Sequence, residues 1–139
     1  MPRETESLSV SVVMPIYNAS DYLRPALDSV IAQTLRDIEI ICIDDGSTDR
    51  SLAILKEYQK KDSRIRIVTE TNAGPAKARN NGIRRARGEY LSFLDADDFF
   101  EPTMLETLYR TAKEKSLDIA VCEYDLFEIR TARFKRSIP

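Results

Sequence analysis

The chain has 139 residues, of which 42% are hydrophobic and 32% are charged, and its formal net charge is −2. This length supports one domain with its own core, and the small net charge gives no bulk attraction to nucleic acid, which we do not expect as a partner. The sequence contains no histidine, which excludes a histidine general base, a Ser-His-Asp triad and histidine-ligated zinc within this chain.

Strand-like and helix-like segments alternate from the start of the chain. Residues 8–14 form a β-branched run that predicts a strand ended by Pro15, and apolar residues at helical spacing predict a helix over 22–31. Residues 38–43 are almost continuously apolar, which is typical of a strand covered on both faces. A polar turn then leads into a helix predicted over 52–61.

The second half continues the alternation, with strands predicted over 65–68, 89–94 and 117–122 and helices over 75–87 and 102–115. Pro75 suits the first position of a helix, and Gly88 suits a helix stop. Alternation of this kind predicts right-handed βαβ units. We therefore expect an α/β fold with a mostly parallel sheet and helices on both faces.

Three features of the sequence bear on the cellular location of the protein. No stretch approaches the roughly 20 apolar residues of a membrane span, and the polar segment 1–7 does not resemble a signal peptide. Cys42 and Cys122 both fall in predicted strands, where we expect small core residues of a reducing compartment without a disulfide. These features favour a cytoplasmic protein.

The run Asp95-Ala96-Asp97-Asp98 directly follows the apolar strand predicted over 89–94. Three neighbouring carboxylates repel one another, and each would lose hydration if it were buried. A hard divalent cation such as Mg²⁺ or Mn²⁺ relieves that repulsion and binds carboxylate and phosphate oxygens. The alternative interpretation is a strand end followed by a helix N-terminus, at which Asp98 is the cap.

Ligands of parallel α/β sheets bind beyond the carboxyl ends of the strands. Pro15-Ile16-Tyr17-Asn18 ends the first predicted strand, and Asp44-Asp45-Gly46-Ser47 ends the second, so both should lie at the same edge as the acidic run. A carboxylate such as Asp44 can accept the N3–H of uracil, and Tyr17 offers a face for stacking. The alternative for residues 44–47 is a turn that only caps the following helix.

Cations follow in the helix predicted over 75–87. Lys77 and Arg79 lie near its N-terminus, where backbone N–H groups also favour anions. The sequence contains neither G-x-G-x-x-G nor G-x-x-x-x-G-K-[ST], which argues against a dinucleotide oxidoreductase and a P-loop NTPase. Metal and a few cations would hold the phosphates instead.

Several motifs now stand in a characteristic order: Val10 to Asn18, Gln33-Thr34, Glu39 to Asp49, Asn72-Ala73-Gly74, Ala78-Arg79-Asn80 and Gly88 to Asp98. In this order they resemble the family 2 glycosyltransferases with the GT-A fold, over roughly residues 8–124. The resemblance implies a nucleotide-diphosphate-sugar donor, often a UDP-sugar, and Mn²⁺ or Mg²⁺ as cofactor. It also implies a place in polysaccharide or cell-envelope biosynthesis.

The resemblance also assigns roles to residues by position. Pro15, Tyr17 and Asn18 match the first nucleotide contacts. Asp44 matches the uracil-binding carboxylate, with Asp45 beside it. Arg79 and Asn80 match helix residues near the nucleotide. Asp95 and Asp97, on either side of Ala96, match a D-x-D pair, in which Asp95 meets the ribose or a metal-bound water and Asp97 coordinates the metal.

The family continues past the fifth strand into an acceptor-binding half, which supplies the general base. Nothing after Asp98 matches that half. We therefore interpret residues 1–139 as the nucleotide-sugar-binding domain of an inverting transferase. The resemblance implies that this transferase acts on the hydroxyl of a carbohydrate or lipid-linked acceptor. Association with a membrane through a further C-terminal region is left open. Two alternatives remain: a non-catalytic nucleotide-sugar-binding module, and a nucleotidyltransferase, although the glycine-rich basic loop of the latter is missing after residue 14.

Overall fold

The computed structural model describes residues 8–128 and 133–136. In this part of the chain, a four-stranded parallel sheet has the strand order β3-β2-β1-β4. Its strands are β1 (Val10–Ile16), β2 (Ile38–Asp44), β3 (Ile65–Thr69) and β4 (Tyr90–Phe93). The helices are α1 (Leu23–Ile31), α2 (Ser51–Lys61), α3 (Pro75–Arg85) and α4 (Met104–Glu114). The expectation for segment 1–7 lies outside the described residues.

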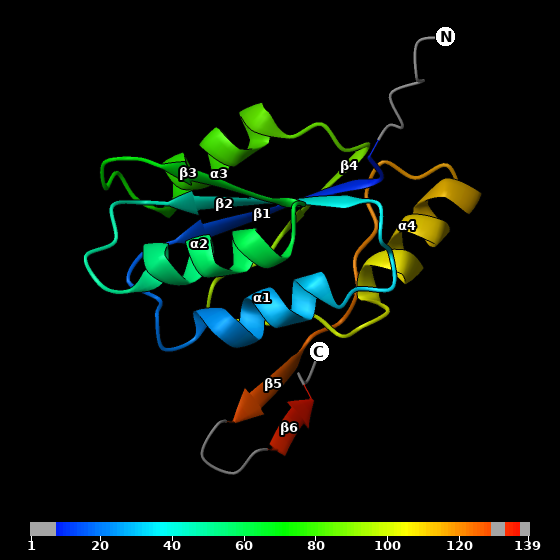
Figure 1. The fold of residues 1–139 in the computed structure, drawn as a ribbon. Helices are drawn as coiled ribbons and strands as arrows, with labels where there is room; N and C mark the ends of the chain where they lie inside the picture. Colours follow the sequence, from blue (N-terminus) through cyan, green and yellow to red (C-terminus); the bar gives the residue numbers. More distant parts are fainter. Residues whose placement is uncertain (1–7, 129–132, 137–139) are drawn as a thin grey trace, which may run out of the picture.

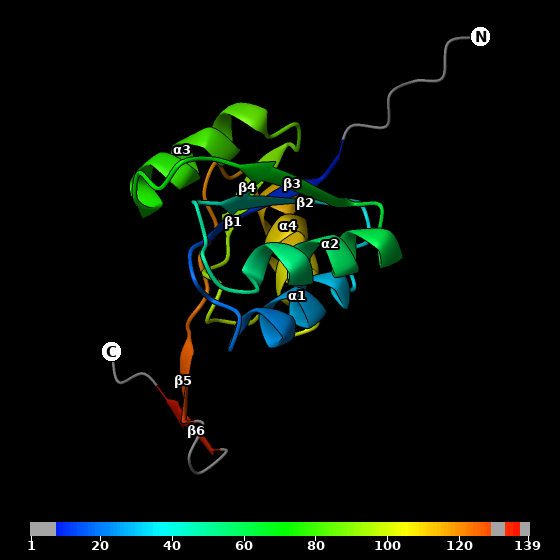
Figure 2. The ribbon, with the colours of Figure 1, turned by 60° about the vertical axis from the view of Figure 1, so that its left-hand side comes forward.

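Helices cover both faces of the sheet, as the alternation of segments predicts (Figures 1 and 2). On one face, Met14 and Cys42 pack in a core that includes residues of α1, α2 and α4. On the other face, Ile41 and Ile43 pack with Ala78 of α3. Because successive residues of a strand point to opposite faces, the continuously apolar sequence of β2 fills both cores.

Helix α3 lies very close to the central strand. A Cβ atom added at Gly82 would come within 2.3 Å of Cγ1 of Val13. Only glycine allows this helix to approach β1 so closely. The approach sets how the start of α3 lies over the carboxyl edge of the sheet.

A buried carboxylate, Glu39, lies at the opposite edge of the sheet, where the strands begin. Glu39 accepts hydrogen bonds from the Ser11 hydroxyl at 2.9 Å and from the Arg87 backbone N–H at 2.9 Å, and Gly88 donates to the Ser11 hydroxyl at 2.8 Å. These bonds pull the chain out of helical geometry, so α3 ends at Arg85. The prediction that the helix runs to Arg87 and stops at Gly88 was therefore wrong.

Pro15 does not end the first strand, contrary to the prediction. It lies opposite Ile43 within β1, which continues to Ile16. The Leu94 N–H donates to the Val13 oxygen, so odd-numbered positions of β1 direct their backbone groups toward β4. The register of β1 with β4 ends at Val13. The missing N–H of Pro15 therefore breaks no ladder hydrogen bond.

The predicted fifth strand over 117–122 is not formed. Ile119 and Val121 are 78% and 85% exposed, and Cys122, expected in the core, is also exposed. Apolar composition signals strand propensity but does not supply a pairing partner, and this segment pairs with no strand among the described residues. The next strands, β5 (Asp125–Glu128) and β6 (Arg133–Arg136), instead pair antiparallel with each other.

The two cysteines lie in different environments. Cys42 is fully buried, as predicted, and both cysteines are free thiols. Burial raises the pKa of Cys42 to about 12.

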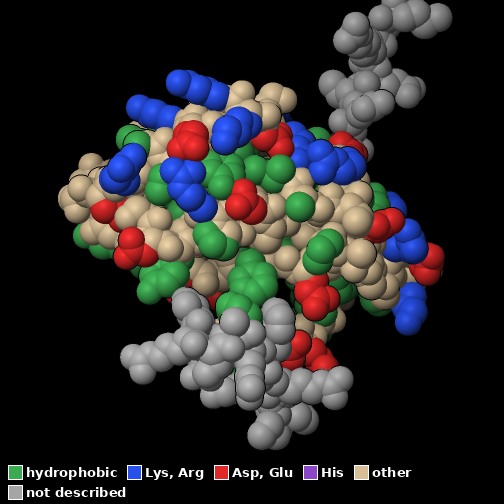
Figure 3. All heavy atoms as spheres, turned by 60° about the horizontal axis from the view of Figure 1, so that its bottom comes forward, with side chains coloured by type: hydrophobic (Ala, Val, Ile, Leu, Met, Phe, Trp, Pro, Cys, Tyr) green, Lys and Arg blue, Asp and Glu red, His purple; other side chains and the backbone are tan. Residues whose placement is uncertain are grey.

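Figure 3 shows acidic and basic side chains interspersed over one face of the molecule. Among the described residues, no helix is both long enough and apolar enough to cross a membrane.

Candidate functional site

The loops after β1 and β2 are tied together at the carboxyl edge of the sheet. Asn18 has a positive φ of 46°, and its backbone N–H donates to the Ser47 hydroxyl at 3.0 Å. Its side-chain oxygen accepts from the backbone N–H groups of Thr48 at 2.7 Å and Asp49 at 3.3 Å. Asparagine tolerates the left-handed region better than most residues. Asn18 therefore holds the two loops in register.

Asp49 and Ser51 complete this link, and the sequence analysis missed both roles. Asp49 accepts from the backbone N–H groups of Ser20 and Ser51 at 3.0 and 2.9 Å. The buried Ser51 hydroxyl accepts from the Ala19 N–H at 3.0 Å. Burial alone would raise the pKa of Asp49, but the hydrogen bonds from Ser51 and Ser20 outweigh it and lower the pKa to about 2. The available signal was the Asp-x-Ser pattern at the start of α2.

Asp44 and Asp45 are adjacent in sequence but have different partners. Both are only 3% exposed. Asp44 accepts one hydrogen bond, from the Ser47 N–H at 3.3 Å. Asp45 uses both carboxylate oxygens to accept from the Ala73 and Gly74 N–H groups, at 2.9 and 3.0 Å. Asp45 therefore anchors the turn before α3, whereas Asp44 retains more acceptor capacity.

The acidic run forms a compact cluster after β4. Ligand oxygens of Asp95, Asp97 and Asp98 lie within 4.8 Å of one another, and all three residues are exposed. Partial burial, followed by the charges of Asp97 and Asp95, raises the pKa of Asp98 above its ordinary value. Exposed carboxylate oxygens held this close together match the donor set of a hard divalent cation.

Asp98 is not the N-cap of α4, contrary to one of the two interpretations. Its backbone N–H donates to the Asp95 oxygen at 3.0 Å, whereas α4 begins at Met104 after the N-cap Thr103. The fully buried Gln33 lies at that helix start instead. Its side-chain oxygen accepts from the Leu105 N–H at 3.0 Å, and its amide donates to the Glu101 oxygen at 2.6 Å.

The remaining predicted residues lie on the same edge or on α3. Arg79 donates to Asp95 at 2.9 Å, which joins α3 to the acidic cluster. Lys77 and Asn80 are exposed on the same helix. Tyr17 is 53% exposed after β1, so a ring face is available for stacking. The two other predicted residues are the half-buried Pro15 and the buried Ala96.

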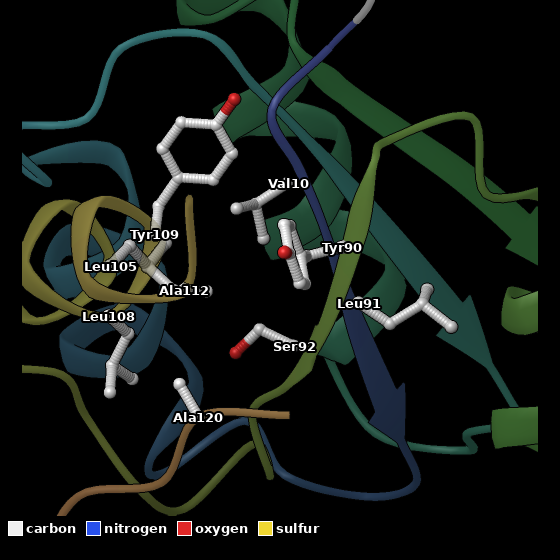
Figure 4. A pocket seen from close by; sticks show the side chains of 9 residues that line it. All are labelled: Val10, Tyr90, Leu91, Ser92, Leu105, Leu108, Tyr109, Ala112 and Ala120. Carbon is white, nitrogen blue, oxygen red and sulfur yellow. The ribbon is translucent and has the colours of Figure 1, made fainter. Parts of the chain in front are cut away.

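A small cavity of about 60 Å³ lies elsewhere, between α4 and β4 (Figure 4). Tyr90, Leu105, Leu108 and Tyr109 are among its mostly apolar lining. It contains none of the predicted site residues and is too small for a nucleotide. The polar edge is the better candidate site.

Known proteins similar to this chain are glycosyltransferases. A family model described as glycosyl transferase family 2 matches residues 11–139. YibD of Escherichia coli, named as an uncharacterized glycosyltransferase, is 45% identical to this chain over 130 residues. The match covers 94% of this chain and 38% of the length of YibD. The chain thus spans little more than a third of this relative.

Two solved structures share the fold. TarS of S. aureus in complex with UDP-GlcNAc has a TM-score of 0.75 at 27% identity, covering 87% of this chain and 38% of that chain. A mannosyltransferase from Pyrobaculum calidifontis, in complex with GDP-Man and Mn²⁺, has a TM-score of 0.67 at 27% identity. The match covers 78% of this chain and 32% of the mannosyltransferase chain. The fold is therefore the expected GT-A type.

Proposed function

Because the chain belongs to glycosyl transferase family 2, we propose that it binds the nucleotide-sugar donor of a transferase that glycosylates a hydroxyl group. The observation that carries this proposal is the gathering of Asp44 and the acidic cluster at one edge of the sheet. Strand β1 separates β2 from β4, so Asp44 and the cluster are about 10 Å apart by strand spacing. A nucleoside diphosphate can bridge that span.

Asp44 is proposed to recognise the base. One of its oxygens already accepts the Ser47 N–H, and the carboxylate has further lone pairs that can accept a donor from the base. Uracil presents such a donor, N3–H. TarS, which has the higher TM-score of the two neighbours described above, is in complex with UDP-GlcNAc, and this favours UDP over GDP. The exposed Tyr17 ring would stack on the base from the loop after β1.

Asp95 and Asp97 would hold Mn²⁺ or Mg²⁺. Their fit rests on the exposed carboxylate oxygens of Asp95, Asp97 and Asp98, which lie within 4.8 Å of one another. When bound, such a cation neutralises charge on the diphosphate leaving group. Lys77 and Arg79, near the start of α3, would add positive charge beside the phosphates, and Asn80 would contribute amide groups.

The chain's own residues chiefly bind and orient the donor. Asn18 and Asp49 hold the loops after β1 and β2, while Asp45 holds the turn before α3. The general base that deprotonates the acceptor is proposed to lie outside residues 1–139. The acceptor is a carbohydrate or lipid-linked hydroxyl, and attack from the face opposite the diphosphate would invert the anomeric centre.

Isothermal titration of this chain with UDP, in Mn²⁺ and then in chelator, tests the proposal. We expect clearly tighter binding with Mn²⁺, and Asp97→Ala should remove most of that gain. Without the cation, the negative charges of the diphosphate face those of Asp95 and Asp98 and repel them. The exposed Asp118 gives a matched control, because it lies beside Glu89 and Tyr90 at the start of β4, whereas the cluster follows the end of that strand. Equal UDP affinity in Mn²⁺ and chelator would refute the metal role, and no UDP binding in either would refute the donor site.

A further inference from the structure

The acidic cluster has a counter-ion supplied by the protein. Nη2 of Arg79 lies 2.9 Å from Oδ1 of Asp95, and the two side chains are 38% and 50% exposed. Within the described part of the chain, Arg79 is the only cation that forms an ion pair with Asp95, Asp97 or Asp98. This ion pair joins the second turn of α3 to the residue that follows Leu94.

The ion pair occupies one oxygen of a carboxylate that the proposed function assigns to a divalent cation. A guanidinium and a divalent cation on the same carboxylate repel each other, so binding of one weakens binding of the other. The cluster also needs a positive charge when no cation is bound, because its three carboxylates lie within 4.8 Å of one another. Arg79 meets that need in the cation-free state.

We propose that Arg79 is an exchangeable counter-ion: a divalent cation displaces its guanidinium from Asp95, and the freed guanidinium then pairs with the diphosphate of the donor. This inference rests on the proposed function, and it adds a coupling between the two ligands. A guanidinium forms forked hydrogen bonds with phosphate oxygens as readily as with a carboxylate.

The geometry makes such an exchange easy. Exposed ion pairs contribute little to stability, since both partners remain solvated. Arg79 is held by a single hydrogen bond to Asp95 and lies on a long flexible side chain. Because the cation frees the guanidinium and the diphosphate retains it, each ligand should raise the affinity of the other by the same factor.

Mn²⁺ binding to the isolated chain, followed by electron paramagnetic resonance without nucleotide, tests the exchange. Arg79→Gln should bind Mn²⁺ about three- to tenfold more tightly than the wild type, because the competing positive charge is gone. In the wild type, UDP should strengthen Mn²⁺ binding, and in Arg79→Gln this strengthening should shrink. Arg84→Gln is the control, since it removes an exposed charge from the same helix at a distance from the cluster.

The outcomes separate this inference from the proposed function. Damage to the fold would weaken Mn²⁺ binding, so tighter binding by Arg79→Gln supports the exchange specifically. Mn²⁺ affinity that depends on Asp97 but is unchanged or weaker in Arg79→Gln overturns the exchange and leaves the metal site standing. Absence of Mn²⁺ binding, with and without UDP, overturns both.

Discussion

The side-chain oxygen of Asn18 accepts a hydrogen bond from the Thr48 backbone N–H at 2.7 Å, and this bond joins the loop after β1 to the loop after β2. The same oxygen also accepts from the Asp49 N–H at 3.3 Å. One amide side chain therefore sets the spacing between the predicted stacking residue Tyr17 and the predicted base acceptor Asp44. Several properties of the site should depend on this spacing.

Asn18→Gly should lower the free energy of unfolding by about 1–2 kcal/mol and weaken UDP binding. Glycine accepts the positive φ of this position, so the variant loses the side-chain hydrogen bonds without added backbone strain. Asn18→Ala should be less stable than Asn18→Gly, since alanine resists the left-handed region. Urea unfolding and UDP titration measure both effects, and a glycine variant as stable as the wild type would contradict this role.

Asp44→Asn should weaken UDP binding by about tenfold and CDP binding much less. Asparagine keeps the shape of the side chain but loses the charge that favours the uracil N3–H. Cytosine has no hydrogen at N3, so its nucleotide gains little from the carboxylate. Parallel titrations with the two nucleotides give the ratio of affinities. An unchanged ratio would mean that Asp44 only stabilises the turn after β2, by accepting the Ser47 N–H.

Glu39→Gln should destabilise the fold by roughly 1–3 kcal/mol at pH 7. Burial alone would raise the pKa of Glu39, but hydrogen bonds from Arg87 and Ser11 and the charges of Arg66 and Arg87 lower it below its ordinary 4.5. A carboxyl whose pKa is lower in the folded state stabilises that state above its unfolded pKa and loses this contribution as pH falls through its folded pKa. Unfolding at pH 7 and at successively lower pH should therefore show the two proteins converging below pH 4.5.

Gly82→Ala should cost about 1–3 kcal/mol, because the added methyl group would meet Cγ1 of Val13 at 2.3 Å. Val13→Ala on its own should also destabilise the fold, by leaving a cavity. The double variant should be more stable than the sum of the two losses predicts, since each change relieves the other. Thermal unfolding of all four proteins tests this, and strict additivity would rule out the contact.

Residues 1–139 should bind the donor but transfer sugar negligibly, although slow donor hydrolysis can persist. Deprotonation of a hydroxyl at neutral pH requires a base within hydrogen-bond reach. The chain has no histidine, and Asp44, Asp45, Asp95 and Asp97 are assigned to nucleotide, metal and loop anchoring. UDP release and product formation across candidate acceptors measure both reactions. Robust acceptor-dependent turnover would place the base within these residues.

Sequence patterns predicted much of the fold because its elements are locally encoded. The apolar run of β2 and the helical spacing in α1 each carry their own periodicity, and the structure confirms both elements. The same reasoning failed for 117–122, whose apolar residues are exposed. A strand needs a partner from elsewhere in the chain, and composition does not reveal whether that partner exists.

The candidate site, like the fold, could be predicted from the sequence only in part. The sequence by itself determined that Asp44 and the run Asp95–Asp98 follow strands, and hence that they meet at one edge of a parallel sheet. Only the tertiary structure decided that Asp45 anchors the turn at Ala73 and that Arg79 pairs with Asp95. These pairings depend on how α3 lies over the sheet. That placement comes from the close contact of Gly82 with Val13, two residues that are distant in sequence and packed together in the fold.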